Sequence, residues 1–213
     1  YLSILLQKFL LDCKDILSDN GVSLSIKTKD YQMKVIKWIV SRFRGEQNIN
    51  KLIRRGLTLG ENCSLGDCFI DPSHCFHITI GNNVTFGPHV HILAHDASTK
   101  IPLDHTRVAN VRIGNNVFIG ASSIVLPGVT IGDNVIVGAG SVVNRNIPSN
   151  TVAAGNPARV IKPLSDFIEA RKKEMTTDNT LGEEYTLRNP NCGVSHREKL
   201  LSLCRDYGQL YIK

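Results

Sequence analysis

Residues 113–142 read IGNNVF, IGASSI, VLPGVT, IGDNVI and VGAGSV, which are five successive blocks of six residues. The first position of every block is Ile or Val, and the series continues at Val143. The fifth position is always small or β-branched, and Gly stands second in four of the blocks. A period of six matches neither the turn of an α-helix nor the alternation of a long strand. The stretch therefore predicts short strands that turn a corner every six residues.

The same pattern extends towards the N-terminus. It is clear in residues 80–91, IGNNVT and FGPHVH, and weaker from Leu59 and Leu65. Gly, Asn and Asp at the corners tolerate a positive φ, which β-branched residues avoid. Stacked turns would align the aliphatic side chains in one core and pair the backbone of each turn with the next. Three strands per turn predict a mainly β solenoid shaped as a triangular prism, while its handedness stays open at this point.

The period is interrupted between Ile92 and Ile113 and resumes three residues out of phase. The intervening residues 94–110 predict a polar loop that protrudes from the prism. Six of the seven histidines lie between residues 74 and 105. Because functional residues are often carried on loops that a rigid scaffold holds, this region is where we expect the chemistry.

The flanks of the repeat predict helices. Apolar residues recur at helical spacing over 2–17 and 30–44, within a predicted N-terminal helical cap of residues 1–56. A C-terminal helical extension is predicted over residues 164–213. It should contain helices at residues 166–175 and 198–207, the second opened by a capping box, Ser195-His196-Arg197-Glu198.

Composition limits the class of protein. The chain has 213 residues, 42% hydrophobic and 21% charged, which suits one folded domain with small additions. No apolar run approaches the ~20 residues of a membrane span, and the N-terminal stretch does not resemble a signal peptide. The formal net charge is +6, but residues 56–158 hold only 4 basic against 6 acidic side chains. They therefore lack the basic stripe of a nucleic-acid-binding surface.

The six cysteines contain no C-x-x-C pair, so we expect free thiols in a reducing, cytoplasmic compartment. Six-residue steps counted from Leu59 and Asp71 place Cys63 and Cys75 at small inward positions of the solenoid. Their burial there needs no role in metal binding or catalysis.

Three motifs together resemble the hexapeptide-repeat acyltransferases: the six-residue blocks, the loop motif His95-Asp-Ala-Ser, and residues 152–161, VAAGNPARVI. Within that family the chain is similar to the branch of galactoside, maltose and capsular-sugar O-acetyltransferases. The resemblance covers residues 57–163, about half of the chain. It implies a left-handed parallel β-helix and a homotrimer with active sites shared between neighbouring subunits. It also implies acetyl-CoA as the co-substrate, lying in the groove between prisms.

The resemblance implies roles for single residues. His95 matches the catalytic histidine at the start of the loop. The positions matched to acetyl-CoA contacts are Ala121, Ala139, Asn144, Arg145, Arg159 and Lys162. The chain departs from the family at Phe118, where Trp is common, and at residues 144–145, where Thr-Lys is common. The acceptor-binding asparagine of the family has no match, because residues 60–79 align badly.

An imidazole suits the implied reaction. A thioester is already activated, so what is missing is a base for the acceptor hydroxyl, and imidazole titrates near neutral pH. A backbone N–H near Ala121 would then stabilise the tetrahedral intermediate. Asp71 could bind acceptor hydroxyls, orient His95, or only form a corner.

The remaining histidines differ in what the sequence predicts for them. His89 and His91 read as corner and surface residues near a neighbouring subunit, and His105 as a loop residue. The roles of His74 and His77 stay open.

The most direct expectation is an acetyl-CoA-dependent O-acetyltransferase that acts on a hydroxyl of a sugar or polysaccharide precursor. Alternatives are N-acetylation of an amino sugar, a sugar-binding prism without turnover, and a zinc hydratase resembling the gamma-type carbonic anhydrases. Those hydratases need two histidines five apart, whereas His91 and His95 are four apart. We therefore expect no metal, and as partners a small sugar acceptor and further copies of the chain, but neither nucleic acid nor a membrane span.

Overall fold

The computed structural model describes residues 47–186, 189 and 191–213. The predicted helices over residues 2–17 and 30–44 lie outside these residues. The first described helix is α3 (Ile49–Arg54), and Asn48 caps it by accepting a hydrogen bond from the backbone N–H of Lys51 (3.1 Å).

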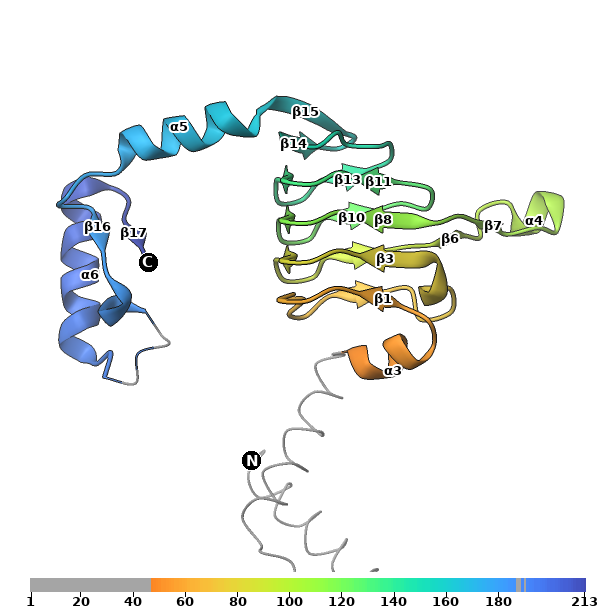
Figure 1. Cartoon of the computed structure of the whole chain (residues 1–213), viewed down its shortest axis with the longest axis horizontal. Helices are drawn as coiled ribbons and strands as arrows, with labels where there is room; N and C mark the ends of the chain where they lie inside the picture. The colour runs from red at the N-terminus through yellow and green to blue at the C-terminus, as the bar shows by residue number, and fades with distance from the viewer. Residues whose placement is uncertain (1–46, 187–188, 190) are drawn as a thin grey trace, which may run out of the picture. The chain divides into compact units, whose positions relative to one another are not determined.

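The repeat forms a stack of short parallel strands in three sheets, which we call A, B and C (Figure 1). Sheet A contains β1 (Thr58–Leu59), β3 (Ile78–Ile80), β8 (Val111–Ile113) and β11 (Thr130–Ile131). Sheet B contains β4 (Thr85–Phe86), β9 (Phe118–Ile119), β12 (Ile136–Val137), β14 (Thr151–Gly155) and the antiparallel β15 (Ala158–Pro163). Sheet C contains β2 (Phe69–Ile70), β5 (His91–Ile92), β10 (Ile124–Val125) and β13 (Val142–Val143).

The chain visits the three sheets in the same order on each turn. Strands β3, β4 and β5 make one coil, β8, β9 and β10 the next, and β11, β12 and β13 the one after that. The predicted parallel solenoid with three strands per turn is therefore confirmed. Its left-handed winding, which the resemblance implies, stays a prediction.

The side chains at the repeat positions fill the interior. The aliphatic positions are at most 2% exposed: Ile113, Ile119, Val125, Ile131, Val137 and Val143. The small fifth positions are buried as well, and the hydroxyls of Ser123 and Ser141 both donate to the carbonyl of Gly138 (3.0 and 2.6 Å). Full burial of a Val or Ile side chain contributes about 1.5–3 kcal/mol, so the repeat itself supplies the core.

Asparagines form a ladder along one corner of the prism. Asn83, Asn116 and Asn134 have φ values of 56°, 54° and 56°. The side-chain amide of Asn83 donates to Asn116 (3.0 Å), and that of Asn116 donates to Asn134 (3.0 Å). Each asparagine therefore both makes the tight turn, in a conformation that Asn tolerates better than most residues, and links its coil to the next.

The first coil departs from the predicted phase. The inward position belongs to Ile70, which pairs with Ile92, so Asp71 begins the following corner. Cys75 is buried as predicted, but it lies in the 3-10 turn η1 (Cys75–His77), and its thiol donates to the carbonyl of Leu52 (3.7 Å). Cys63 is half-buried against the core.

The C-terminal segment contains α5 (Leu164–Glu174), β16 (Thr180–Leu181), η2 (Glu183–Tyr185), α6 (Val194–Tyr207) and β17 (Tyr211–Ile212). Strands β16 and β17 pair in parallel, and the Glu174 carboxylate accepts hydrogen bonds from the Tyr211 hydroxyl (2.7 Å) and the Gln209 amide (3.0 Å). The two predicted helices are present, but the predicted capping box is wrong. The N-cap of α6 is the extended residue Gly193, which places Ser195 inside the first turn, where its side chain cannot act as the cap.

None of the helices in the described part of the chain has the length and apolar character needed to cross a membrane. The five cysteines within that part, Cys63, Cys68, Cys75, Cys192 and Cys204, are free thiols.

Candidate active site

The interruption of the repeat forms a two-stranded ribbon that projects from the prism (Figure 1). Strands β6 (His95–Asp96) and β7 (Arg107–Val108) pair antiparallel, and the short helix α4 (Lys100–Leu103) lies at the tip. The base of the ribbon is fixed by two hydrogen bonds. The N–H of Ala109 donates to the carbonyl of Ala94 (2.9 Å), and the Arg107 guanidinium donates to the carbonyl of Pro127 (3.2 Å).

The structure brings two predicted site residues together at this base. Nδ1 of His95 is hydrogen-bonded to Oδ2 of Asp71, although the two residues are 24 positions apart. They meet because Ile70 and Ile92 are register partners on adjacent coils, so the corners that follow them lie side by side. The Asp71 side chain is fully buried, whereas the His95 side chain is 35% exposed.

Asp71 is an ionised, acceptor-only group. Burial opposes its charge, but hydrogen bonds from His95 and from the backbone N–H groups of His74 (3.2 Å) and Ser73 (3.0 Å) outweigh it and lower the pKa of the carboxyl. A carboxylate cannot donate, so Nδ1 of His95 must carry the proton. The neutral ring then has its lone pair on Nε2, which is the arrangement that a general base requires.

His74 is a member of this cluster that the sequence left unassigned. Its ring lies 4.7 Å from the ring of His95, and its Nδ1 lies 3.7 Å from Oδ2 of Asp71. That nitrogen is buried without a hydrogen-bond partner among the described residues. The signal that could have located it is the motif Asp71-Pro-Ser-His74, because an Asp commonly accepts hydrogen bonds from the N–H groups that follow it in a tight turn.

The other histidines occupy separate positions. His91 faces outward from sheet C beside Phe69, with ring centroids 5.4 Å apart. His89 is a corner residue with a φ of 59°, paired with Asp67 (3.2 Å). His105 lies in the ribbon and bonds to the carbonyl of Leu103.

His77 extends from η1, and its Nδ1 lies 2.7 Å from Oδ1 of Asn110. Its position next to the base of the ribbon could not be read from the repeat, since residues 71–77 depart from it.

The residues predicted to contact acetyl-CoA fall on two different corners of the prism. Ala121 and Ala139 follow the register partners Ile119 and Val137, so they share the corner between sheets B and C. Asn144 follows sheet C, on the same corner as Asp71 and the base of the ribbon. One chain therefore does not bring all of these residues to one edge.

The basic residues among these predictions are exposed. Arg145 stands next to Asn144, after sheet C. Arg159 and Lys162 lie on β15, opposite Ala154 and Val152 of β14, so they extend sheet B beyond the last full coil. Among the hydrogen bonds that the described residues make, none uses the N–H of Ala121 or Ala139, which leaves both as donors at their corner.

The described residues also include one group with the spacing of a metal site. One donor atom each from Asp71, His74 and His95 lies within 4.8 Å of the others. Two nitrogens and one carboxylate oxygen form a donor set of the kind found in zinc sites. Nδ1 of His95 and Oδ2 of Asp71 are already hydrogen-bonded to each other, so these two atoms could bind a metal only if that bond were broken.

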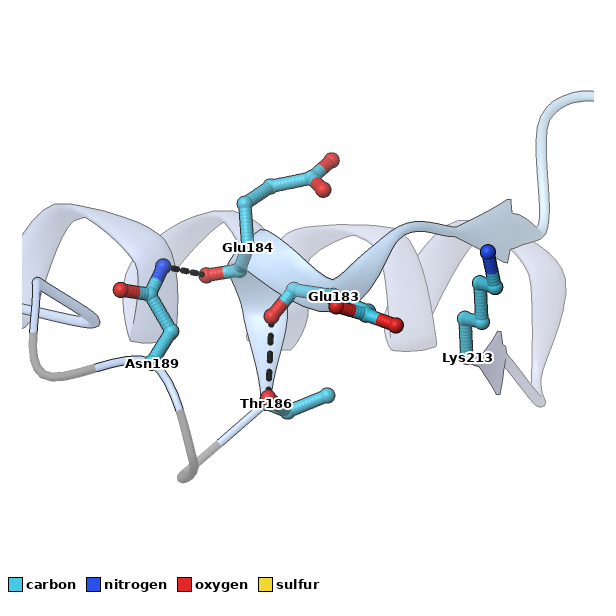
Figure 2. Close-up of a pocket in the computed structure, with 5 residues that line it drawn as sticks. All are labelled: Glu183, Glu184, Thr186, Asn189 and Lys213. Carbon is cyan, nitrogen blue, oxygen red and sulfur yellow. Dashed lines mark hydrogen bonds between the residues drawn. The ribbon is translucent and has the colours of Figure 1, made fainter.

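A separate hollow lies in the C-terminal segment, with a volume of about 510 Å³. Its lining residues are Glu183, Glu184, Thr186, Asn189 and Lys213 (Figure 2). Asn189 and Thr186 donate to the backbone carbonyls of Glu184 and Glu183 (both 2.9 Å), so these side chains hold the turn itself. The hollow contains none of the predicted site residues, and the candidate site remains at His95.

A rigid parallel solenoid with an ionised Asp–His pair at the base of a projecting ribbon is a scaffold for proton-transfer chemistry. The family model described as "Bacterial transferase hexapeptide (six repeats)" matches residues 110–145. Protein CapG of Staphylococcus aureus is 41% identical over 140 residues, which are 63% of this chain and 80% of CapG.

A galactoside O-acetyltransferase of Escherichia coli (strain K12) is 44% identical over 98 residues, which are 43% of this chain and 46% of that protein, so the chain spans about half of its length. A solved structure of a maltose O-acetyltransferase from Clostridium difficile 630 is 29% identical, with a TM-score of 0.44, and the match covers 75% of this chain and 88% of that chain. The chain belongs to the family of hexapeptide-repeat acyltransferases.

Proposed function

We propose that the protein transfers an acetyl group from acetyl-CoA to a hydroxyl of a sugar or polysaccharide precursor, with His95 as the general base. The observation that carries the proposal is the hydrogen bond from Nδ1 of His95 to the buried, ionised Asp71. It fixes the tautomer that leaves Nε2 free to accept a proton. Similarity to a galactoside O-acetyltransferase supports the choice of donor and acceptor class.

In this reaction Nε2 of His95 takes the proton of the acceptor hydroxyl while the oxygen attacks the thioester carbonyl. The carbonyl oxygen gains negative charge in the tetrahedral intermediate, and a backbone N–H at Ala121 would donate to it. The intermediate collapses by breaking the C–S bond, and the imidazolium returns its proton to the CoA sulfur. Asp71 stabilises the imidazolium between these steps, which assigns it an orienting role in preference to direct binding of the acceptor.

A homotrimer would complete the site. His95 lies on a different corner of the prism from Ala121 and Ala139. We therefore propose that each prism is a left-handed β-helix and that each active site combines His95 of one chain with Ala121 and Ala139 of a neighbouring chain. The outer face of sheet C supports this, because its register column consists of Phe69, His91, Ile124 and Val142. The matching column on sheet A is polar: Thr58, Thr79, Arg112 and Thr130. An apolar column of this kind is expected to be covered in the assembly.

Association can be tested with one substitution on each face. Light scattering should give three times the chain mass of 23.5 kDa for the wild type. Ile124→Asp should dissociate the trimer, because the interface would have to bury an unpaired carboxylate. Thr130→Asp, at a strand position on sheet A, should leave it intact. A monomeric wild type at micromolar concentration would contradict both the trimer and the shared site.

The donor site can be tested through the basic residues of β15. A charge-assisted hydrogen bond contributes about 1.5–3 kcal/mol, so Arg159→Ala with Lys162→Ala should raise the KM for acetyl-CoA at least tenfold. If the 3′-phosphate is their target, the KM for acetyl-dephospho-CoA should hardly change. Lys172→Ala, an exposed lysine of α5, is the matched control. Equal KM values for wild type and double variant with both thioesters would move the CoA site elsewhere.

The proposed function itself is tested by following CoA release across a panel of sugars and amino sugars. Release that depends on a sugar with free hydroxyls supports O-acetylation, and strict dependence on the amine would favour the N-acetyltransferase alternative. Absence of release with every acceptor would contradict turnover and favour a binding protein. The cluster of Asp71, His74 and His95 keeps the zinc hydratase as a second candidate. Stoichiometric zinc, with hydration of CO₂ that is lost on chelation, would favour it.

A further inference from the structure

A row of aromatic rings leads away from the candidate base. The His74 ring lies 4.7 Å from His95 and 6.2 Å from Phe76, and Phe76 lies 4.5 Å from His77. Except for His95, all of these rings stand on one short segment, the turn η1 and the residue before it. Phe76 is 58% exposed, more than any other Phe among the described residues.

The exposure of Phe76 is built into the fold. Its neighbour Cys75 is buried and anchored to the carbonyl of Leu52, and the turn before it is held by Asp71. Phe76 also lies close to Gly56: a Cβ atom added to Gly56 would be only 2.7 Å from the Cβ of Phe76. On the other side His77 contacts Asn110 at the base of the ribbon. Since both sides of the turn are fixed, the ring is held in a position where none of the described residues buries it.

Exposed apolar side chains often mark ligand-binding sites, so an aromatic ring that is fixed in solvent near the proposed base His95 is a candidate binding surface. Two other Phe side chains face outward: Phe118 lies on β9 of sheet B, and Phe69 belongs to the column of sheet C that the proposed trimer would cover. The Phe76 ring, in contrast, is connected to the Asp71–His95 pair by the ring of His74, which lies between Phe76 and His95. A ligand that rests on Phe76 and reaches His95 must therefore span a row of three rings, and it must offer an apolar face at one end and a hydroxyl at the other.

We propose that Phe76, flanked by His74 and His77, is the platform for the acceptor, and that the acceptor is a cyclic sugar. The C–H face of a pyranose ring would rest on Phe76, and its hydroxyl would point to Nε2 of His95. The proposal rests on the acetyltransferase function given above. It selects cyclic glycosides over open-chain polyols and over small amino-acid acceptors, because these offer no continuous C–H face to an aromatic ring.

The test compares Phe76→Ala and Phe76→Tyr with wild type, each as the whole chain of 213 residues. The acceptors are a methyl pyranoside and the open-chain alditol of the same sugar. Wild type should prefer the pyranoside. Phe76→Ala should raise the KM for the pyranoside about tenfold, equal to ~1.4 kcal/mol, and should lose the preference. Phe76→Tyr should restore the KM for the pyranoside and the preference for it. In both variants kcat and the KM for acetyl-CoA should stay within about twofold of the wild-type values, since Phe76 contacts neither the thioester nor the base.

Two controls separate the possible outcomes. Ile168→Ala removes an exposed apolar side chain from α5, 41% exposed in the structure, and should change no kinetic constant. Circular dichroism establishes that each variant is folded, and Phe76→Leu provides a second non-aromatic residue if Phe76→Ala is not. If a folded non-aromatic variant keeps the wild-type KM for the pyranoside and the preference for it over the alditol, the platform is wrong. Acetyl transfer by the wild type would in that case still support the proposed function. If wild type acetylates no sugar at all, the proposed function fails, and the platform fails with it.

Discussion

His95→Ala should lower kcat for acetyl transfer by ~10²–10⁴, the range expected when a general base is lost. The KM for acetyl-CoA should change little, because the imidazole would meet the donor only at its thioester end. The loss should be confined to the chemical step, so the variant should keep the oligomeric state of the wild type. In the wild type kcat/KM should rise with pH as the base loses its proton, and the variant should lack this rise. The measurement is steady-state CoA release over a range of pH.

Two other histidines are controls for this result. His105 bonds within the ribbon, and His91 faces outward from sheet C beside Phe69, so neither contacts the Asp71–His95 pair. His105→Ala and His91→Ala should therefore retain most of the activity. If His95→Ala stays within a few-fold of wild type while one of these variants abolishes turnover, the base has been assigned to the wrong residue. If all three variants turn over like wild type, the histidine mechanism is wrong.

The fold was largely predictable because one physical rule is repeated. An aliphatic residue at every sixth position and an asparagine or glycine at the corners encode the same coil several times over. The inward positions of residues 113–143 therefore follow from the spacing alone. The rule fails in residues 60–79: six-residue steps from Leu59 and Leu65 lead to residue 71, whereas the inward position on sheet C belongs to Ile70, one residue earlier.

That same departure explains what the sequence could not show about the site. His95 was located by its place at the start of the interruption and by resemblance. Its contact with Asp71 depends on the register of two neighbouring coils, and one of them is out of phase with the repeat. The positions of His74 and Phe76 depend on a 3-10 turn that no periodicity encodes. A short capping motif also failed to predict a helix start, because α6 begins at Val194, before the predicted capping box of residues 195–198.

Asp71→Asn should lower kcat nearly as much as loss of the base, by ~10²–10⁴, although the substitution only replaces one carboxylate oxygen with an NH₂ group. Oδ2 of Asp71 accepts from both the Ala94 N–H (3.2 Å) and Nδ1 of His95. In Asp71→Asn the amide oxygen would keep the place of Oδ1, which accepts from the N–H groups of Ser73 and His74, so the NH₂ would take the place of Oδ2. There it loses the bond from the Ala94 N–H and donates to Nδ1, which forces the His95 proton onto Nε2, where it blocks the base. Nitrogen NMR of the imidazole distinguishes the two tautomers, so the cause can be measured apart from the loss of rate.

Asp67→Asn is the matched control, because Asp67 also pairs with a histidine, His89 (3.2 Å), but at an exposed corner. It should change neither kcat nor the tautomer of His95. The two variants should also differ in stability. The pKa of Asp71 is lowered from the ordinary value of 3.8, so its stabilising contribution is complete above that pH and disappears as the pH falls through the lowered pKa. The decrease in Tm caused by Asp71→Asn should therefore be largest near neutral pH and should shrink in acid. A normal kcat in Asp71→Asn, with the proton still on Nδ1 of His95, would contradict the orienting role of Asp71.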